Sequence, residues 1–173
     1  MPASYQSPTR GDVNQKTTVS QSTKSNLASG TATVANLISG KGNDVFAISP
    51  EDTLGTAVEL LRDKRIGALV VTDSAGSLRG ILSERDIVRK LAETPGRTLP
   101  QQVKEVMTTN VEVCAPKETL VSVLRRMTDG RFRHMPVVEN GAPNGMITIG
   151  DVVNYRLNEL EHEALQLKQM IVG

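Results

Sequence analysis

The sequence predicts an α+β fold in which two similar units pack against each other about a pseudo-twofold axis. The first observation is an internal duplication: Pro50, Thr53, Leu54 and Arg65 recur 66 positions later, and Gly80 and Asp86 recur 65 positions later. The second is the order of predicted elements, which is strand, helix, strand, strand, helix in each copy. A long duplication that occurs only twice is typical of two compact modules and not of a solenoid. We therefore expect small sheets with helices on one side, and a ligand cleft between the modules.

The chain of 173 residues divides into four parts by composition. Residues 1–30 hold ten Ser or Thr and few large apolar side chains, so we expect a disordered tail there. The first unit is expected to span residues 33–96 and the second residues 100–158, with a stretch rich in Pro and Gly between them. Residues 159–173 are expected to extend the last helix of the second unit.

The elements of the first unit follow from hydrophobic spacing and from turn and cap residues. A short helix is expected to lead into this unit, because Val34, Leu37 and Ile38 have helical spacing and Gly40 and Gly42 follow. A strand is expected next, at 45–48, and then a helix that Asp52 or Thr53 caps and Gly67 breaks, with Leu54, Val58 and Leu61 on one face. Strands at 68–71 and 78–82 follow, and a second helix is expected around Ile87, Val88 and Leu91.

The second unit repeats this order. Asn140 and Gly141 form a strong hairpin signal between its last two strands. The predicted elements are a strand at 111–114, a helix with Leu120, Val123, Leu124 and Met127 on one face that Gly130 ends, strands at 135–138 and 146–149, and a helix that begins near Asp151.

The last helix carries a heptad pattern beyond the second unit. Its apolar positions are Val153, Leu157, Leu160, Ala164, Leu167 and Ile171. This seam could pack on its own module or against the same helix of a second chain. We favour the second alternative and expect a homodimer.

Composition argues against several functional classes. The net charge of +1 gives no electrostatic basis for a nucleic-acid or membrane partner, and no apolar run approaches the 18 residues that a membrane span needs. The chain has no apolar secretory stretch and one cysteine, Cys114, so we expect a cytoplasmic protein. His134, His162 and Cys114 lack ligand spacing, and neither a nucleophile–base pair nor a P-loop is present. We expect no metal site, no catalytic residues and no enzymatic activity.

Two duplicated motifs stand where a strand turns into a helix: Ser83-x-x-Asp86 and Thr148-x-x-Asp151. The simplest interpretation is a capping box, in which the hydroxyl and the acid satisfy free backbone N–H groups. The same geometry also suits ligand binding. A carboxylate there can accept hydrogen bonds from the two hydroxyls of a ribose, and the free N–H groups of the helix start can meet a phosphate. Both interpretations are compatible.

The repeated phrases resemble a tandem pair of cystathionine-β-synthase (CBS) domains, a Bateman module of the stand-alone bacterial type. The phrases are ISPEDTL and CAPKETL at the start of the units, RIGALVV and RFRHMPVV in the centre, and GILSERD and GMITIGD at the end. They cover about residues 33–158. The resemblance implies a non-enzymatic regulatory sensor that binds an adenosine-containing ligand and signals to a separate partner protein. AMP is the first choice, ahead of ADP, ATP, NADH and S-adenosylmethionine.

The resemblance also implies two ligand sites, each with an adenine pocket from the opposite repeat. Site A would combine Ile81, Ser83 and Asp86 with Val111, Glu112, Phe132, Arg133 and His134. Site B would combine Met146, Thr148 and Asp151 with Val45, Phe46, Ile66, Gly67 and Ala68. Arg133 and His134 are expected to give site A a positive charge for a phosphate, with Arg85 as second choice, whereas site B is expected to lack one. Two alternatives remain open: a structural dimerisation module with degenerate sites, and an enzyme that uses His134 as acid or base.

Overall fold

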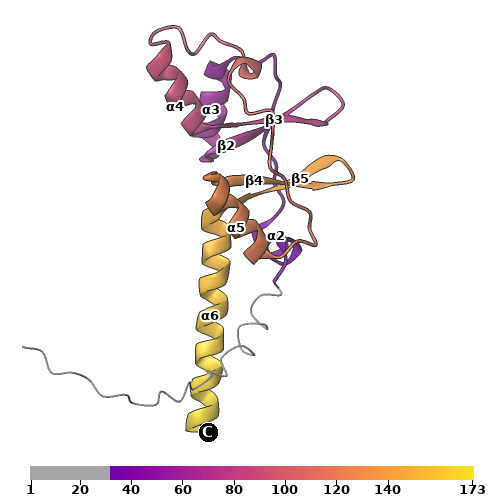
Figure 1. Cartoon of the computed structure of the whole chain (residues 1–173), viewed down its shortest axis with the longest axis vertical. Coiled ribbons are helices and arrows are strands. Elements are labelled where there is room, and N and C mark those ends of the chain that lie inside the picture. Colours follow the sequence, from indigo (N-terminus) through magenta and orange to yellow (C-terminus); the bar gives the residue numbers. More distant parts are fainter. Residues whose placement is uncertain (1–31) are drawn as a thin grey trace, which may run out of the picture.

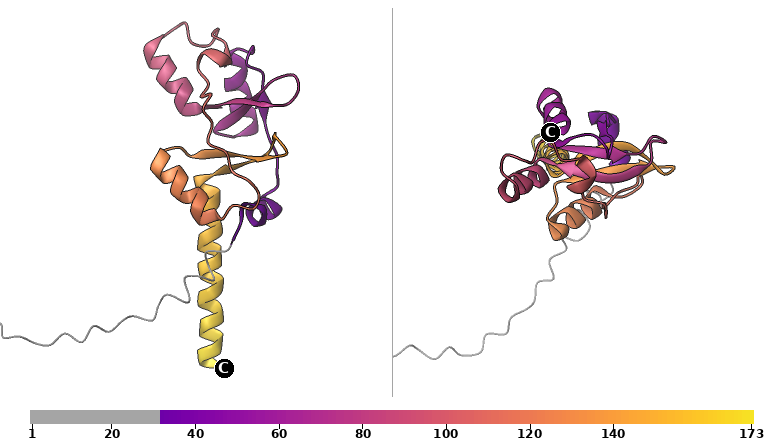
Figure 2. Two further views of the ribbon diagram at one scale, coloured as in Figure 1. Left: turned by 45° about the vertical axis from the view of Figure 1, so that its right-hand side comes forward. Right: turned by 90° about the horizontal axis from the view of Figure 1, so that it is seen from above.

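Two small sheets face each other in the middle of the molecule, and the helices lie on their outer sides (Figure 1). The computed structural model describes residues 32–173. The tail expected at residues 1–30 lies outside this range. The α+β class and the two similar units are confirmed, and Figure 2 shows the same stacking of the units from the side.

The first repeat has a sheet of three strands and two helices. Strand β1 pairs with β2 in parallel, and β2 pairs with β3 in antiparallel register, with Ala68 opposite Ser83. The elements are β1 (Ala47–Ile48), α3 (Leu54–Lys64), β2 (Ala68–Thr72), β3 (Leu78–Ser83) and α4 (Glu84–Glu93).

The second repeat has a sheet of two antiparallel strands. A short 3₁₀ helix, η1 (Val103–Glu105), precedes it. Its elements are α5 (Leu120–Gly130), β4 (His134–Glu139), β5 (Ala142–Thr148) and α6 (Ile149–Val172). The predicted hairpin turn is confirmed, because Asn140 (φ 53°) and Gly141 (φ 80°) both adopt the left-handed conformation that such a turn needs.

The predicted strand at 111–114 is wrong. In this segment only Cys114 pairs with the sheet, through its N–H to the Pro136 carbonyl (3.0 Å) and through its own carbonyl to the Val138 N–H (2.9 Å). The predicted end of the last strand is also wrong. Ile149 begins α6 because Thr148 caps that helix.

Helix α5 ends at Gly130 as predicted, whereas α3 ends at Lys64, before the expected Gly67, and each helix has an arginine as its C-cap. Arg65 and Arg131 both have φ 55°, a left-handed conformation. The following N–H reaches back to close the helix, from Ile66 to the Leu61 carbonyl and from Phe132 to the Met127 carbonyl (3.1 Å each). These hydrogen bonds close the last turn of each helix, which offsets the cost of the unusual backbone.

Two hydrophobic cores correspond to the two repeats. Val58 is exposed on α3, contrary to its predicted place on the apolar face, and Ala57 is buried instead. The larger members of the first core are Ile48, Leu54, Leu61, Leu69, Val71, Leu82 and Ile87, and those of the second are Leu120, Val123, Met127, Met135, Val137, Ile147 and Val152.

Helix α2 (Val34–Lys41) packs on the second repeat although it precedes the first. Its Val34 and Leu37 side chains are buried in the second core. The Val34 N–H also donates to the Glu118 carbonyl (2.9 Å), and the Leu120 N–H donates to the Ala32 carbonyl (2.9 Å). Residues 42–46, which we call the crossing segment, therefore pass from the second repeat to the sheet of the first.

Helix α6 projects well beyond the second repeat (Figures 1 and 2). Its 24 residues correspond to about 36 Å. Val152 is buried against the second core, whereas every residue from Leu160 onward is exposed. The seam therefore does not pack on its own module. Within residues 32–173, no helix has the length and apolar character needed to cross a lipid bilayer.

Candidate functional site

The two predicted acid motifs have the same geometry at the starts of α4 and α6. Oδ2 of Asp86 accepts hydrogen bonds from the Ser83 N–H (2.9 Å) and the Ser83 hydroxyl (2.7 Å), and the Asp86 N–H donates back to Ser83 Oγ (3.4 Å). In the second repeat, Oδ2 of Asp151 accepts from the Thr148 N–H (2.9 Å), and the Asp151 N–H donates to Thr148 Oγ1 (3.1 Å). Both acids are half-buried. The capping boxes are therefore real, and they hold each carboxylate at a helix start.

A hydrogen bond to the central strand fixes each helix start further. The Glu84 N–H donates to the Gly67 carbonyl (3.0 Å), and the Ile149 N–H donates to the Arg133 carbonyl (2.9 Å). These bonds occupy equivalent positions in the two repeats. Gly67 and Arg133 therefore lie beside the acid motif of their own repeat.

Asp151 differs from Asp86 because the lysine at the end of α2 reaches it. The Lys41 ammonium donates to Oδ2 of Asp151 and to the Met146 carbonyl (2.7 Å). Burial alone raises the pKa of Asp151, but hydrogen bonds from Lys41 and from the Thr148 backbone outweigh burial and hold that pKa below its usual value. The expectation that site B lacks a positive charge is wrong.

Sequence reasoning missed Lys41, which stands 110 residues from Asp151. The internal duplication marks the segment that holds Lys41. The offset of 66 residues places Lys41 opposite Met107, in the equivalent segment that leads into the second repeat. In the first repeat, this equivalent segment meets strand β3. Ile81 and Thr108 exchange both backbone hydrogen bonds, at 3.0 and 2.9 Å.

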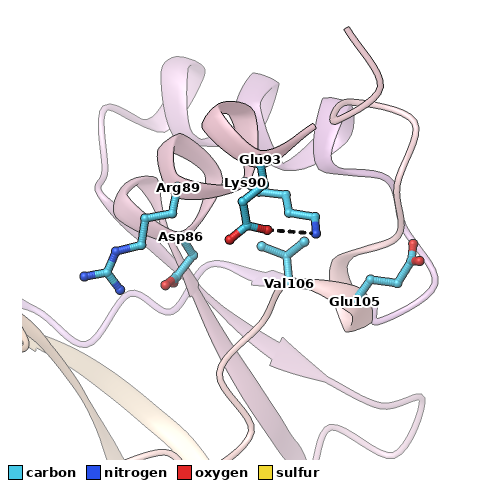
Figure 3. Close-up of a pocket in the computed structure, with 6 residues that line it drawn as sticks. All are labelled: Asp86, Arg89, Lys90, Glu93, Glu105 and Val106. Carbon is cyan, nitrogen blue, oxygen red and sulfur yellow. Dashed lines mark hydrogen bonds and ion pairs between the residues drawn. The ribbon is translucent and has the colours of Figure 1, made fainter. Parts of the chain in front are cut away.

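Asp86 lines a hollow of about 230 Å³ beside α4 (Figure 3). Arg89 and Lys90 follow Asp86 at helical spacing and share its face, and Lys90 forms an ion pair with Glu93 (3.1 Å). Glu105 and Val106 complete the lining. Arg89 and Lys90 were not predicted, although their spacing from Asp86 on a predicted helix was a usable signal.

The opposite-repeat residues expected in site A have varied surroundings. Phe132 packs against the second core, Arg133 is exposed, and Glu112 forms an ion pair with Arg126 (2.6 Å). Val111 is half-buried outside any strand. Arg85 crosses between the repeats, where its guanidinium donates to the Arg131 carbonyl (3.3 Å).

His134 lies at the contact between the repeats. A Cβ atom on Gly67 would be 3.0 Å from His134 Nε2 and 2.9 Å from Glu84 Oε1, so the glycine provides the space in which both side chains lie. Burial lowers the pKa of His134, and the opposing effect of Glu84 does not restore it. His134 therefore carries little positive charge at neutral pH, contrary to the expectation that it gives site A a positive charge for a phosphate.

The first-repeat residues expected in site B have mixed placements. Phe46 and Ile66 pack against the first core, and Ala68 is buried opposite Ser83. Val45 is half-buried in the crossing segment, and Gly67 meets His134. Lys41 is thus the first-repeat side chain with a hydrogen bond to the acid motif of site B.

The described part of the chain offers little for a metal or a nucleophile. No group of three His, Cys, Asp or Glu side chains within residues 32–173 is placed to hold a metal ion. Cys114 is buried, and burial raises the pKa of its thiol to about 12. A thiol with such a pKa is a poor nucleophile at neutral pH.

Comparison with known proteins gives concordant matches. The family model described as "CBS domain" matches residues 41–93 and 103–158. The CBS domain-containing protein CBSX3, mitochondrial, of Arabidopsis thaliana is 30% identical over 149 residues, which cover 82% of this chain and 72% of that protein. CBSCBSPB1 of the same plant is 31% identical over 138 residues, and the chain spans 25% of its length.

Solved structures show the same architecture. A CBS-domain-containing protein from Agrobacterium tumefaciens is 42% identical, with a TM-score of 0.71 over 73% of this chain and 95% of that one. The CBS domain pair of protein MJ0100, solved in complex with 5′-methylthioadenosine and S-adenosyl-L-methionine, has a TM-score of 0.66 at 22% identity, over 74% of this chain and 98% of that one.

Proposed function

The chain belongs to the CBS-domain family as a tandem pair of CBS domains, and on that premise we propose that it is a regulatory module that binds an adenosine-containing ligand between its repeats. One observation carries this proposal: two half-buried carboxylates stand at equivalent helix starts, and each accepts a hydrogen bond from the backbone N–H of the Ser or Thr three residues earlier. Within residues 32–173, no donor forms a hydrogen bond to Oδ1 of either acid.

This arrangement suits a ribose. A carboxylate oxygen that is held in place can accept hydrogen bonds from vicinal hydroxyls without first being ordered. The helix start beside it favours a negatively charged group on the same ligand. The complex of the MJ0100 domain pair with two adenosine-containing compounds supports this class of ligand.

We assign the polar part of each site as follows. Site A contains Ser83 and Asp86, with Arg89 available for a phosphate, and site B contains Thr148 and Asp151, with Lys41. AMP is the first choice of ligand, and a dinucleotide such as NADH is the second. Ligand binding would change the contact between the repeats and thereby act on a separate partner protein, without catalysis.

Calorimetry with AMP tests the proposal through charge-removing variants that keep the caps. In Asp86→Asn/Asp151→Asn, each amide oxygen can still accept the N–H of Ser83 or Thr148. Each lost charged hydrogen bond should weaken binding by about 1.5–3 kcal/mol, roughly 10- to 150-fold. Asp73→Asn is the matched control, because Asp73 accepts the N–H groups of Ala75 and Ser77 (3.0 Å each) in a turn. Unchanged AMP affinity in the double variant would rule out these acids as ribose ligands.

A second candidate function is structural dimerisation, which the exposed seam of α6 favours. Leu157, Leu160 and Leu167 are 52%, 47% and 59% exposed, which is unusual for leucines on one helix face. We propose that α6 pairs with the same helix of a second copy. A thermal-shift screen of AMP, ADP, ATP, NADH and S-adenosylmethionine separates the candidates, because a purely structural module would show no shift with any of them.

A further inference from the structure

Lys41 occupies the polar centre of site B. Its ammonium lies between the Asp151 carboxylate, which a ribose would otherwise meet, and the Met146 carbonyl. The side chains of Lys41 and Asp151 are 38% and 25% exposed, so the pair is partly shielded from water. A ribose whose vicinal hydroxyls take both Oδ1 and Oδ2 of Asp151 must displace this ammonium from Oδ2.

The lysine stays close after such a displacement. Helix α2 is held in the second core by Val34 and Leu37. On the other side of Lys41, Nδ2 of Asn43 donates to Oδ1 of Asn144 (3.2 Å) and ties the crossing segment to β5. The backbone of Lys41 is therefore anchored on both sides, while its four-carbon side chain can turn to a new partner.

Site A has no equivalent charge at this position. The repeat offset places Met107 where the second site has Lys41. Backbone hydrogen bonds between Ile81 and Thr108 connect that segment to β3 and take the place of a side-chain contact. A ligand in site B therefore displaces an ammonium group from the acid motif, whereas a ligand in site A meets no equivalent charge at this position.

We propose that Lys41 makes site B select nucleotides with a phosphate over neutral nucleosides; this inference rests on the proposed function of the same site. When a ribose takes Asp151, Lys41 loses its anionic partner. AMP replaces that partner with its phosphate, whereas adenosine leaves the ammonium without one. Lys41 therefore weakens the binding of adenosine, whereas it leaves the binding of AMP unchanged or strengthens it.

The experiment measures AMP and adenosine affinities by calorimetry in chains that carry Asp86→Asn, so that site B dominates. Lys41→Met should tighten adenosine binding several-fold and reduce the preference for AMP over adenosine at least tenfold. Lys41→Arg should keep that preference, because it keeps the charge. Lys104→Met is the matched control: Lys104 also forms an ion pair, with Glu51 (2.7 Å), but outside the acid motifs, and its loss should change neither affinity.

Two failures can be told apart. If both ligands bind but Lys41→Met changes their affinities equally, the selectivity role is refuted and the proposed function stands. If neither ligand binds the chain with an intact Lys41 and intact acids, the proposed function and this inference are both refuted.

Discussion

Charged substitutions in the α6 seam should dissociate the proposed dimer. Leu160→Glu/Leu167→Glu places two carboxylates where the heptad pattern predicts contact with a second chain. Complete burial of a leucine is worth about 1.5–3 kcal/mol, and these two are about half exposed (47% and 59%), so each contributes roughly 0.8–1.5 kcal/mol on association.

Symmetry doubles this loss. In a twofold dimer each substitution occurs twice, so four side chains are affected. The expected loss is about 3–6 kcal/mol before the cost of burying charge, which weakens association by roughly 150- to 20,000-fold. Such a change converts a micromolar dimer into a monomer at tens of micromolar.

Sedimentation equilibrium measures the outcome, with Leu165→Glu as the matched control. Leu165 is 56% exposed on the same helix but lies off the seam, so its substitution should leave the dimer intact. A wild-type chain that stays monomeric at tens of micromolar refutes the dimer. A dimer that tolerates the double substitution refutes the seam and points to the groove of about 530 Å³ between α3 and α4, where Val88 and Leu91 are exposed.

Three further predictions concern stability and reactivity. Leu37→Ala should lower the free energy of unfolding by about 2–5 kcal/mol in urea titrations followed by circular dichroism, because Leu37 is buried in the second core; a loss below about 0.5 kcal/mol would show that α2 is not docked there. Burial in the folded chain lowers the pKa of His134, so the unfolded chain takes up the proton at a higher pH, and the free energy of unfolding should fall as the pH drops below about 6.5. His134→Gln should reduce this pH dependence of stability. An unchanged pH profile in that variant would contradict the buried neutral imidazole. Cys114 should react with a thiol reagent at pH 8 only after unfolding, because burial raises its pKa to about 12; rapid labelling of the native protein would contradict this.

The sequence by itself determined the fold class, the family and the placement of both acid motifs. These features depend on neighbours within a few positions. The caps at Thr53 and Thr119, the hairpin at Asn140 and the helix starts at Asp86 and Asp151 all form between residues two to four apart. Duplication strengthened each weak signal, because the same pattern occurred twice in the same order.

Some local features were still misjudged from the sequence. The left-handed C-cap residues of α3 and α5 are Arg65 and Arg131, and α3 ends at Lys64, before the expected Gly67. The backbone tolerates this conformation because a hydrogen bond from the next residue closes each helix end. Gly67, expected to break the helix, instead makes room for His134 from the other repeat.

Only the tertiary structure decided which residues far apart in the sequence meet at the acid motifs. Lys41 reaches Asp151 because α2 packs on the second repeat before the chain crosses to the first. Phe132, expected in the pocket of site A, packs against the second core, and Glu112 pairs with Arg126. Hydrophobic spacing predicts that a helix has a buried face, but it does not predict which of two similar cores that face will cover. That choice depends on the packing of both repeats at once, and it places the charge in each site.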